Sequence, residues 1–118
     1  MTAPDNLSRL RHIFDACQEA LKFVESQNKE DLQHNRMLAL ALIKELEIIG
    51  EAANNISMDC QLQYPDVPWK DMIGMRNRLV HAYFGINYDI IWQTVTKSLP
   101  VLLVDIEIII EKESRNRQ

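Results

Sequence analysis

The stretch ALALIKELEIIGEAA, residues 39–53, decides the fold of this chain. Its apolar residues recur at alternating steps of three and four positions, which places them along one side of an α-helix. The positions that keep this spacing are Ala39, Leu42, Leu46, Ile49, Ala53 and Ile56. The pattern predicts a long packed helix that begins near Asn28 or Asp31 and ends near Asn55. Asn35 is a polar residue on its apolar side, where it either fixes the register or lies beyond the packed region.

Two other segments repeat this spacing, one before and one after the central segment. The first follows a cap at Asp5 or Asn6, and the second follows a cap at Asn87. Their apolar positions are Leu7, Leu10, Phe14, Cys17, Leu21 and Val24, then Tyr88, Trp92, Val95, Leu99, Leu102, Ile106 and Ile109. Pro100 lies inside the last segment and predicts a kink there, because proline has no backbone N–H. A further helix is expected from Pro68 to about His81.

Together these segments predict an all-α, up-and-down bundle of four main helices, folded as a single domain over residues 1–118. Only 3 residues are glycine and 4 are proline, which favours helices over a fold with many turns. Because glycine weakens a helix, Gly50 and Gly74 predict places where another backbone comes close. The last segment has more apolar residues than one seam can bury, which indicates a second packed surface and hence a homodimer. The surplus residues are Ile90, Ile91, Val104 and Ile108.

Charge and cysteine content narrow the possible functions. The formal net charge is −4 at pH 7, which disfavours binding to nucleic acid through bulk charge but allows a small basic site. No apolar run is long enough to span a bilayer, and the start does not read as a secretory signal. Cys17 and Cys60 lack the spacing of metal ligands, and we expect them to be buried thiols in a reducing cytoplasm.

One polar stretch stands apart from the apolar patterns: MRNRLVHAYFGIN, residues 75–87. Histidine exchanges protons near neutral pH, and arginine is a planar, permanently charged clamp for phosphate. Such groups suit cleavage of RNA, in which the ribose 2′-hydroxyl is the nucleophile and no metal is required. The alternative is a solvated helix end stabilised by the helix dipole. The residues in question are Arg76, Asn77, Arg78, His81 and Tyr83.

Two further groups of polar residues each allow a functional and a structural interpretation. Glu51 lies four positions after Glu47, and it could orient Arg76 or an arginine of a second copy, or belong to a solvated stripe. One helix face has three residues of the types that bind metal ions, His12, Asp15 and Glu19. Nothing else in the chain has a typical ligand spacing, so we expect neither a metal site nor a cofactor.

The sequence Arg76-Asn77-x-x-x-His81-x-Tyr83 resembles the Arg-x4-His-x-Tyr motif of HEPN domains, in particular that of HepT-like toxins. The resemblance includes residues 48–53 (IIGEAA), 64–69 (YPDVPW) and 74–85, and extends from about residue 38 to residue 104. It implies a HEPN-like bundle that cleaves RNA as the toxin of a toxin–antitoxin pair, with its site in a cleft at a dimer interface. It also implies a minimal nucleotidyltransferase antitoxin that transfers AMP to Tyr83.

In this interpretation the chain is a cytoplasmic, metal-independent endoribonuclease. His81 acts as general base or general acid, and Arg76 stabilises the charge that develops on the phosphate oxygens. The residues expected to position the substrate are Asn77, Arg78 and Glu51. The first alternative is a non-catalytic HEPN accessory module that binds nucleotide, or a partner, for a nucleotidyltransferase. The second is a structural dimer in which Arg76 and His81 pair with Glu51 for stability alone.

Overall fold

A computed structural model describes residues 5–79 and 85–116, and for Arg76 it describes the backbone alone. The elements in this part of the chain are helices, which confirms the predicted all-α class. In chain order they are α1 (Asn6–Phe23), α2 (Lys29–His34), α3 (Arg36–Asn54), α4 (Met58–Gln63), α5 (Trp69–Leu79), α6 (Tyr88–Gln93), the π-helix η1 (Thr94–Ser98) and α7 (Leu99–Asn116).

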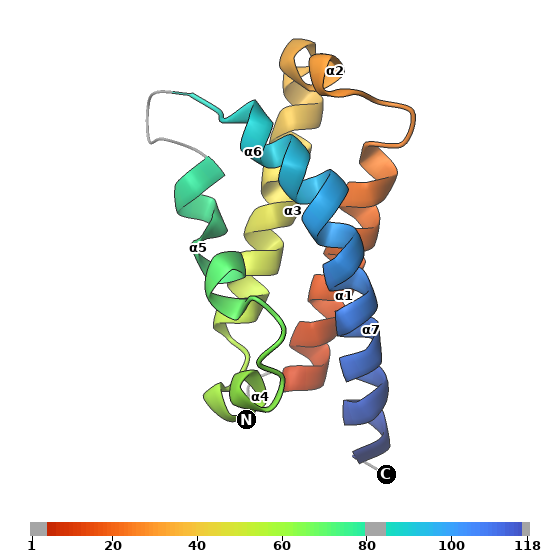
Figure 1. Ribbon diagram of the computed structural model, residues 1–118, viewed down its shortest axis with the longest axis vertical. Coiled ribbons are helices and arrows are strands. Elements are labelled where there is room, and N and C mark those ends of the chain that lie inside the picture. Colours follow the sequence, from red (N-terminus) through yellow and green to blue (C-terminus); the bar gives the residue numbers. More distant parts are fainter. Residues whose placement is uncertain (1–4, 80–84, 117–118) are drawn as a thin grey trace.

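The four long rods of the bundle are α1, α3, α5 and the continuous run α6–η1–α7 (Figure 1). Successive rods alternate in direction, as an up-and-down bundle requires. Helix α3 packs on both α1 and α5, and α7 packs on α1. The largest fully buried side chains come from all four rods and from α2; they are Leu10, Ile13, Leu32, Leu42, Leu46, Leu79, Ile91, Ile106, Val95 and Cys17.

Helix α1 begins where the sequence predicts, because the side chain of Asp5 accepts a hydrogen bond of 2.9 Å from the backbone N–H of Ser8. Its buried face is broader than the predicted seam. Phe14 is only partly buried, whereas Ile13, Ala16 and Ala20 are fully enclosed. The reason is that α1 lies between two neighbours, α3 and α7, and a single seam of apolar residues faces only one.

The prediction of one long helix from residue 28 or 31 to residue 55 is wrong in its first part, because the helix is interrupted at Asn35. This residue has extended φ and ψ angles of −126° and 91°, and its side chain caps α3 by accepting from Leu38 N–H at 3.1 Å. The preceding short helix, α2, has its own capping box formed by Asn28 and Asp31. Asn35 is therefore a helix cap and not a polar residue within a packed seam.

The connection between α3 and α5 contains a short helix, α4, which the apolar spacing did not predict. Ser57 caps it by accepting a hydrogen bond from Cys60 N–H at 3.2 Å. Ser57 also joins the start of α1, since Asn6 Nδ2 donates to its Oγ and its own N–H donates to Asn6 Oδ1, each at 2.9 Å. These bonds hold the end of α3 against the beginning of α1.

The two glycines within helices have opposite surroundings. A Cβ atom on Gly50 of α3 would lie 2.8 Å from the carbonyl oxygen of Met72 in α5, so the predicted close approach of another backbone is confirmed there. A Cβ on Gly74 would meet nothing within 4 Å. The close contact predicted at Gly74 is therefore wrong, because that position faces open space.

Replacing each glycine by alanine should change stability in opposite directions. We expect Gly74→Ala to raise the free energy of unfolding by up to about 1 kcal/mol, because alanine is the better helix former. We expect Gly50→Ala to lower it by about 1–3 kcal/mol, because the methyl group forces α3 and α5 apart. Urea denaturation followed by circular dichroism measures both, and a change of the same sign in the two variants would contradict this account.

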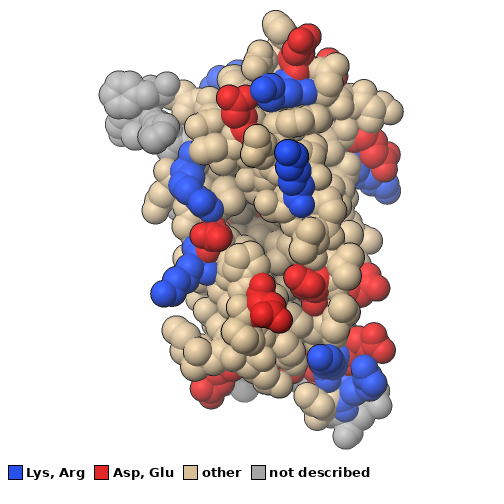
Figure 2. All heavy atoms as spheres, in the orientation of Figure 1, with Lys and Arg blue, Asp and Glu red and all other residues tan. Residues whose placement is uncertain are grey.

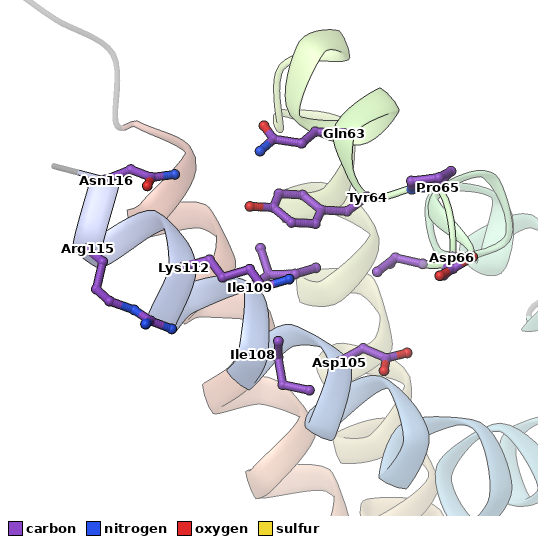
Figure 3. A pocket seen from close by; sticks show the side chains of 11 residues that line it. Gln63, Tyr64, Pro65, Asp66, Asp105, Ile108, Ile109, Lys112, Arg115 and Asn116 are labelled. Carbon is purple, nitrogen blue, oxygen red and sulfur yellow. The ribbon is translucent and has the colours of Figure 1, made fainter.

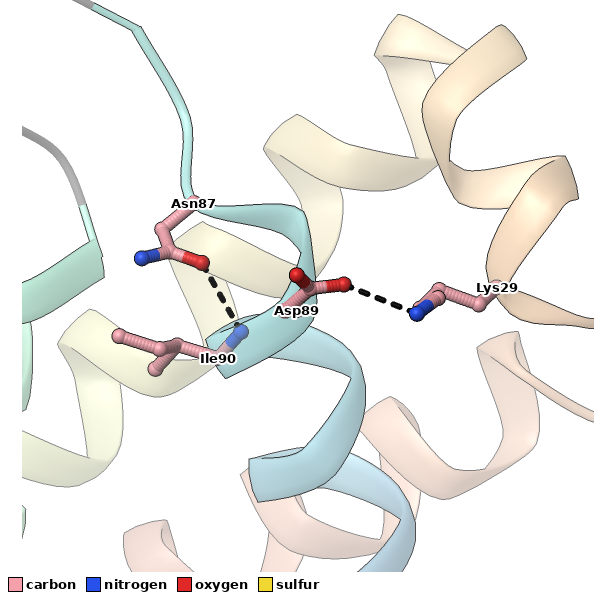
Figure 4. Close-up of polar contacts among 4 residues, drawn as sticks. All are labelled: Lys29, Asn87, Asp89 and Ile90. Carbon is pink, nitrogen blue, oxygen red and sulfur yellow. Dashed lines mark hydrogen bonds and ion pairs between the residues drawn. The ribbon is translucent and has the colours of Figure 1, made fainter.

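The last rod begins at Asn87, which caps α6 by accepting from Ile90 N–H at 3.1 Å, as the sequence predicts (Figure 4). Before Pro100 the helix widens into the π-turn η1, where Leu99 N–H donates to Thr94 oxygen. The wider turn accommodates the missing N–H of the proline. The rod changes direction between α6 and α7 (Figure 1), which agrees with the predicted kink.

Some of the surplus apolar residues in this last helical run are buried in the monomer, and others are exposed. Ile91 is fully buried and Ile90 partly buried, so these two residues belong to the core of the monomer. Val101, Val104 and Ile108 of α7 remain 63%, 58% and 48% exposed. They lie at steps of three and four and so form one stripe on the helix surface. The prediction of a second apolar surface therefore holds for α7 alone, and the homodimer stays a prediction.

Both cysteines are free and buried, as expected. Burial, with a smaller contribution from the charge of Glu45, raises the pKa of the Cys17 thiol to about 12. Burial, together with the charge of Glu113, raises the pKa of Cys60 to about 11. Neither thiol ionises near neutral pH. None of the helices in residues 5–79 and 85–116 has both the length and the apolar composition needed to cross a membrane.

Glu45 is a carboxylic acid within the apolar contact between α3 and α1, with only 5% of its surface exposed. Burial raises its pKa to about 7, and the hydrogen bond and negative charge of Glu19 act in the same direction. The folded protein therefore holds this proton more tightly than the unfolded chain does. It follows that the free energy of unfolding falls as the pH rises from about 4.5 to about 7.

We expect Glu45→Gln, which keeps the shape without the charge, to raise the melting temperature at pH 8 and to change it little at pH 5. Each unit of pKa shift corresponds to about 1.4 kcal/mol, so the gain at pH 8 is at most about 3 kcal/mol. Thermal unfolding by circular dichroism at the two pH values tests this, with the exposed Glu107→Gln as control. A gain that is equal at both pH values would show that the charge of Glu45 is not its cause.

Candidate functional site

Helix α5 presents the first half of the polar stretch, and the segment before it holds that helix in place. Trp69 is buried at the start of α5, and its Nε1–H donates to the carbonyl oxygen of Tyr64 at 2.9 Å. Pro68 supplies the first-turn acceptor, since Met72 N–H donates to its oxygen at 3.0 Å. Leu79 is fully buried at the other end of the helix. The backbone that displays Arg76 and Asn77 is thus anchored at both ends.

Residues 80–84 of the stretch, which include the predicted residues His81 and Tyr83, lie outside the described residues, as does the side chain of Arg76. Two contacts lie at the ends of this segment. Asn87 N–H donates to Leu79 oxygen at 3.1 Å, which joins the end of α5 to the start of α6. Lys29 of α2 forms an exposed ion pair of 3.0 Å with Asp89 of α6, beside the Asn87 cap (Figure 4).

Asn77 and Glu51 line the same hollow, as the positioning role predicted for both requires. This groove has a volume of about 560 Å³ and follows the outer side of α3, between α1 and α5. The lining residues are Arg9, His12, Lys44, Glu47, Ile48, Gly50, Glu51, Ala52, Asn54, Ile73 and Asn77. Glu51 and Asn77 are exposed, so both are free to meet a ligand in the groove.

Arg78 does not join this group. Its Nη2 donates to the carbonyl oxygen of Asp71 at 3.0 Å and lies 4.0 Å from the sulfur of Met75, so the side chain folds back along its own helix. It lines a different hollow, together with Ile90 and Thr94. The predicted substrate-positioning role of Arg78 stays untested, and within the described residues Arg78 shares no hollow with Asn77.

Three basic residues of the groove were not assigned to this site by the sequence: Arg9, His12 and Lys44. His12 was instead considered with Asp15 and Glu19, which line another hollow farther along α1. Within residues 5–79 and 85–116, no three histidine, cysteine or acidic residues are grouped as metal ligands. The only sequence signal for the groove is the spacing of Arg9 and His12 at three positions on the polar face of α1.

A second large hollow lies between α7 and the connection from α4 to α5. It has a volume of about 680 Å³ and an apolar floor that includes Ile109, and it presents Lys112 and Arg115 opposite Gln63 and Asp66 (Figure 3). Tyr64 at its edge donates its hydroxyl to Glu113 Oε2 at 2.7 Å. Burial and that carboxylate raise the pKa of Tyr64 to about 12. No described residue of the polar stretch lines this hollow.

Basic side chains are not concentrated on the face of the molecule seen in Figure 2. There the described lysine and arginine residues alternate with acidic residues over broad uncharged areas. This agrees with the net charge of −4 and shows no continuous basic tract in that view. On this face, attraction for a polyanion can come only from a local group of cations.

Residues 13–109 match the family model described as "Ribonuclease HepT-like". The chain belongs to the HepT-like ribonuclease family. The match includes Glu51 and the whole polar stretch, and it confirms the resemblance inferred from the motif. Two residues of the groove, Arg9 and His12, precede the matched segment.

Similar proteins are found in Caldanaerobacter, Methanocaldococcus and Thermococcus. A Caldanaerobacter subterraneus protein named "Putative RNase TTE0752" is 39% identical over 104 residues, 88% of this chain and 93% of its own length. A Methanocaldococcus jannaschii protein named "Putative RNase MJ1380" is 36% identical over 109 residues, 92% of this chain and all of its own length. A Thermococcus cleftensis protein named "Probable ribonuclease HepT" is 39% identical over 88 residues, 71% of this chain and 80% of its own length. No solved structure matches this HepT-like chain.

Proposed function

We propose that this HepT-like protein is a metal-independent endoribonuclease, the toxin of a toxin–antitoxin pair. The observation that carries the proposal is that the family match spans the complete Arg76–Tyr83 motif. The fixed backbone of α5 supports it, because it holds Asn77 beside Glu51 at the edge of an open groove. Two relatives that the match covers almost completely are named "Putative RNase TTE0752" and "Putative RNase MJ1380", which supports the same activity.

The chemistry follows from the groups of the motif. A base removes the proton of the ribose 2′-hydroxyl, and the 2′-oxygen attacks phosphorus to form a P–O2′ bond. The P–O5′ bond breaks as an acid protonates the leaving oxygen, giving a 2′,3′-cyclic phosphate and a 5′-hydroxyl. His81 is the base or the acid, and Arg76 stabilises the charge on the phosphate oxygens. Asn77 and Glu51 position the phosphate or the guanidinium.

Concerted cleavage needs a base and an acid at the same time, and the motif contains one histidine. The proposal therefore includes a homodimer in which His81 of a second copy provides the other proton transfer. The exposed stripe of Val101, Val104 and Ile108 supports self-association, because these apolar side chains gain by leaving water. The proposed site is then complete only when two motifs meet. Both RNA and the ATP used by the antitoxin are available in the cytoplasm, where we place the reaction.

We expect cleavage of total RNA in the presence of EDTA, with cyclic phosphate ends on the products. His81→Ala and Arg76→Ala should each reduce the rate by about 10²- to 10⁴-fold, the usual contribution of a general acid–base group. The matched controls are His34→Ala and Arg115→Ala, which change exposed residues on α2 and α7. Gel analysis of the fragments gives the rates, and circular dichroism verifies folding.

Cleavage by wild type that the two folded motif variants lose would support the nuclease. Absence of cleavage by the wild-type protein, or equal rates in the motif variants and controls, would overturn it. The better account would then be a non-catalytic accessory module that binds nucleotides for a nucleotidyltransferase.

Regulation is proposed to occur at Tyr83. The phenolic oxygen attacks the α-phosphorus of ATP, pyrophosphate leaves, and AMP remains on the tyrosine. The added bulk and negative charge beside Arg76 then block an RNA phosphate by occupancy and repulsion. The enzyme of this step is a minimal nucleotidyltransferase antitoxin, a separate chain.

We expect incubation with such a nucleotidyltransferase and ATP to add AMP to the wild-type protein and to abolish its cleavage of RNA. Tyr83→Phe should stay unmodified and active, whereas the control Tyr88→Phe, in α6, should be modified like wild type. Intact-mass spectrometry reports the modification, and the cleavage assay reports its effect. Addition of AMP to the Tyr83→Phe variant would show that the acceptor is another residue.

A further inference from the structure

The groove beside α3 extends well away from the motif. Helices α1 and α5 both run antiparallel to α3 (Figure 1), so Arg9 and His12, near the start of α1, lie toward the end of α3. Asn77, near the end of α5, lies toward the opposite end. The hydrogen bonds between Asn6 and Ser57 fix this arrangement. The groove thus leads from the motif toward the part of α1 that contains Arg9.

Arg9 and Lys44, the arginine and lysine of this groove, form no ion pair within the described residues. The ion pairs found there join Lys29 to Asp89 and Arg115 to Glu111, and they include neither Arg9 nor Lys44. The Nε atom of Arg9 is shielded from water and has no hydrogen-bond acceptor in this part of the chain. A buried donor without an acceptor is unfavourable. The side chain of Arg9 is half-buried at the groove, and its guanidinium charge has no ion-pair partner among the described residues.

We propose that this groove is the path of the RNA strand next to the scissile bond, with Arg9 and Lys44 contacting its phosphates and His12 lying between α1 and the strand. The inference rests on the proposed function and adds positioning residues to it. The three side chains line the same hollow as Asn77, which adjoins Arg76 in the sequence. A strand bound at Asn77 and continued along the groove passes these cations.

The acidic residues of the groove favour a polymer over an isolated phosphate ion. Glu47 and Glu51 lie on α3 beside the cations and repel a phosphate placed against them. The same carboxylates accept hydrogen bonds from base amino groups and ribose hydroxyls. Single-stranded RNA presents phosphates alternating with such donors, so it matches a groove in which cations and carboxylates are mixed. The match also needs no large basic patch on this acidic protein.

The test measures RNA binding separately from cleavage. Fluorescence anisotropy of a labelled single-stranded oligoribonucleotide is recorded in a His81→Ala background, so that the RNA stays intact. Arg9→Gln/Lys44→Gln removes the two proposed contacts while keeping long polar side chains. The control Arg11→Gln/Lys22→Gln makes the same change of charge at two exposed residues of α1 outside the groove. Circular dichroism verifies that every variant is folded.

We expect the groove variant to raise the Kd for RNA about tenfold and to reduce the slope of log K against log salt by about 1.4, or 0.7 per lost phosphate contact. In the active protein the same pair of changes should raise KM and leave kcat unaltered. Equal Kd values and salt slopes in the groove and control variants, or no RNA binding by the parent protein, would overturn the proposal. If the groove variant loses RNA binding but the wild-type protein does not cleave RNA, the groove proposal is supported and the ribonuclease proposal is overturned.

Discussion

The close approach of α3 and α5 at Gly50 is the constraint on which the rest of the structure depends. With no side chain at this position, the backbone of α3 comes into contact with the carbonyl of Met72. The crossing point fixes where α5 lies, and α5 in turn places Asn77 beside Glu51 and displays Arg76. Because Gly50 has no side chain, the groove is also deeper at this position. One glycine therefore sets both the packing of the bundle and the shape of the candidate site.

Apolar spacing predicted the long helices of this protein well. The reason is that the bundle is held together by long rows of apolar residues, and such rows can be recognised in a single sequence. This spacing located the seam of α7, and together with residue types it located the cap at Asn87, the cap at Asp5 (with Asn6 as the alternative) and the close contact at Gly50. It failed at Asn35, where a cap and a seam residue look alike until the backbone angles are known. It failed again at Gly74, because a glycine that contacts another backbone and a glycine that faces water have the same sequence signature.

Apart from Glu51, the candidate site was predictable only where its residues lie close together in the sequence. The motif from Arg76 to Tyr83 is a local pattern, and the family match confirms the resemblance drawn from it. Arg9 and Lys44 come from two other helices and meet Asn77 only through the packing of α1 and α5 against α3. No spacing rule joins such distant positions. Arg78 shows the converse: it adjoins the motif in sequence, yet its hydrogen bond to Asp71 turns it away from the groove.

The hydrogen bond between Leu79 and Asn87 also bears on how the protein can evolve. The contacts that secure the two ends of this interval belong to buried Leu79, to the Asn87 cap and to the Lys29–Asp89 pair. These contacts join the end of α5 to the start of α6 directly, so the loop-closure entropy of the interval is lost once, when the bundle forms. Substitutions at Leu79 or Asn87 would open this junction. Selection for stability therefore acts on the two ends of the interval.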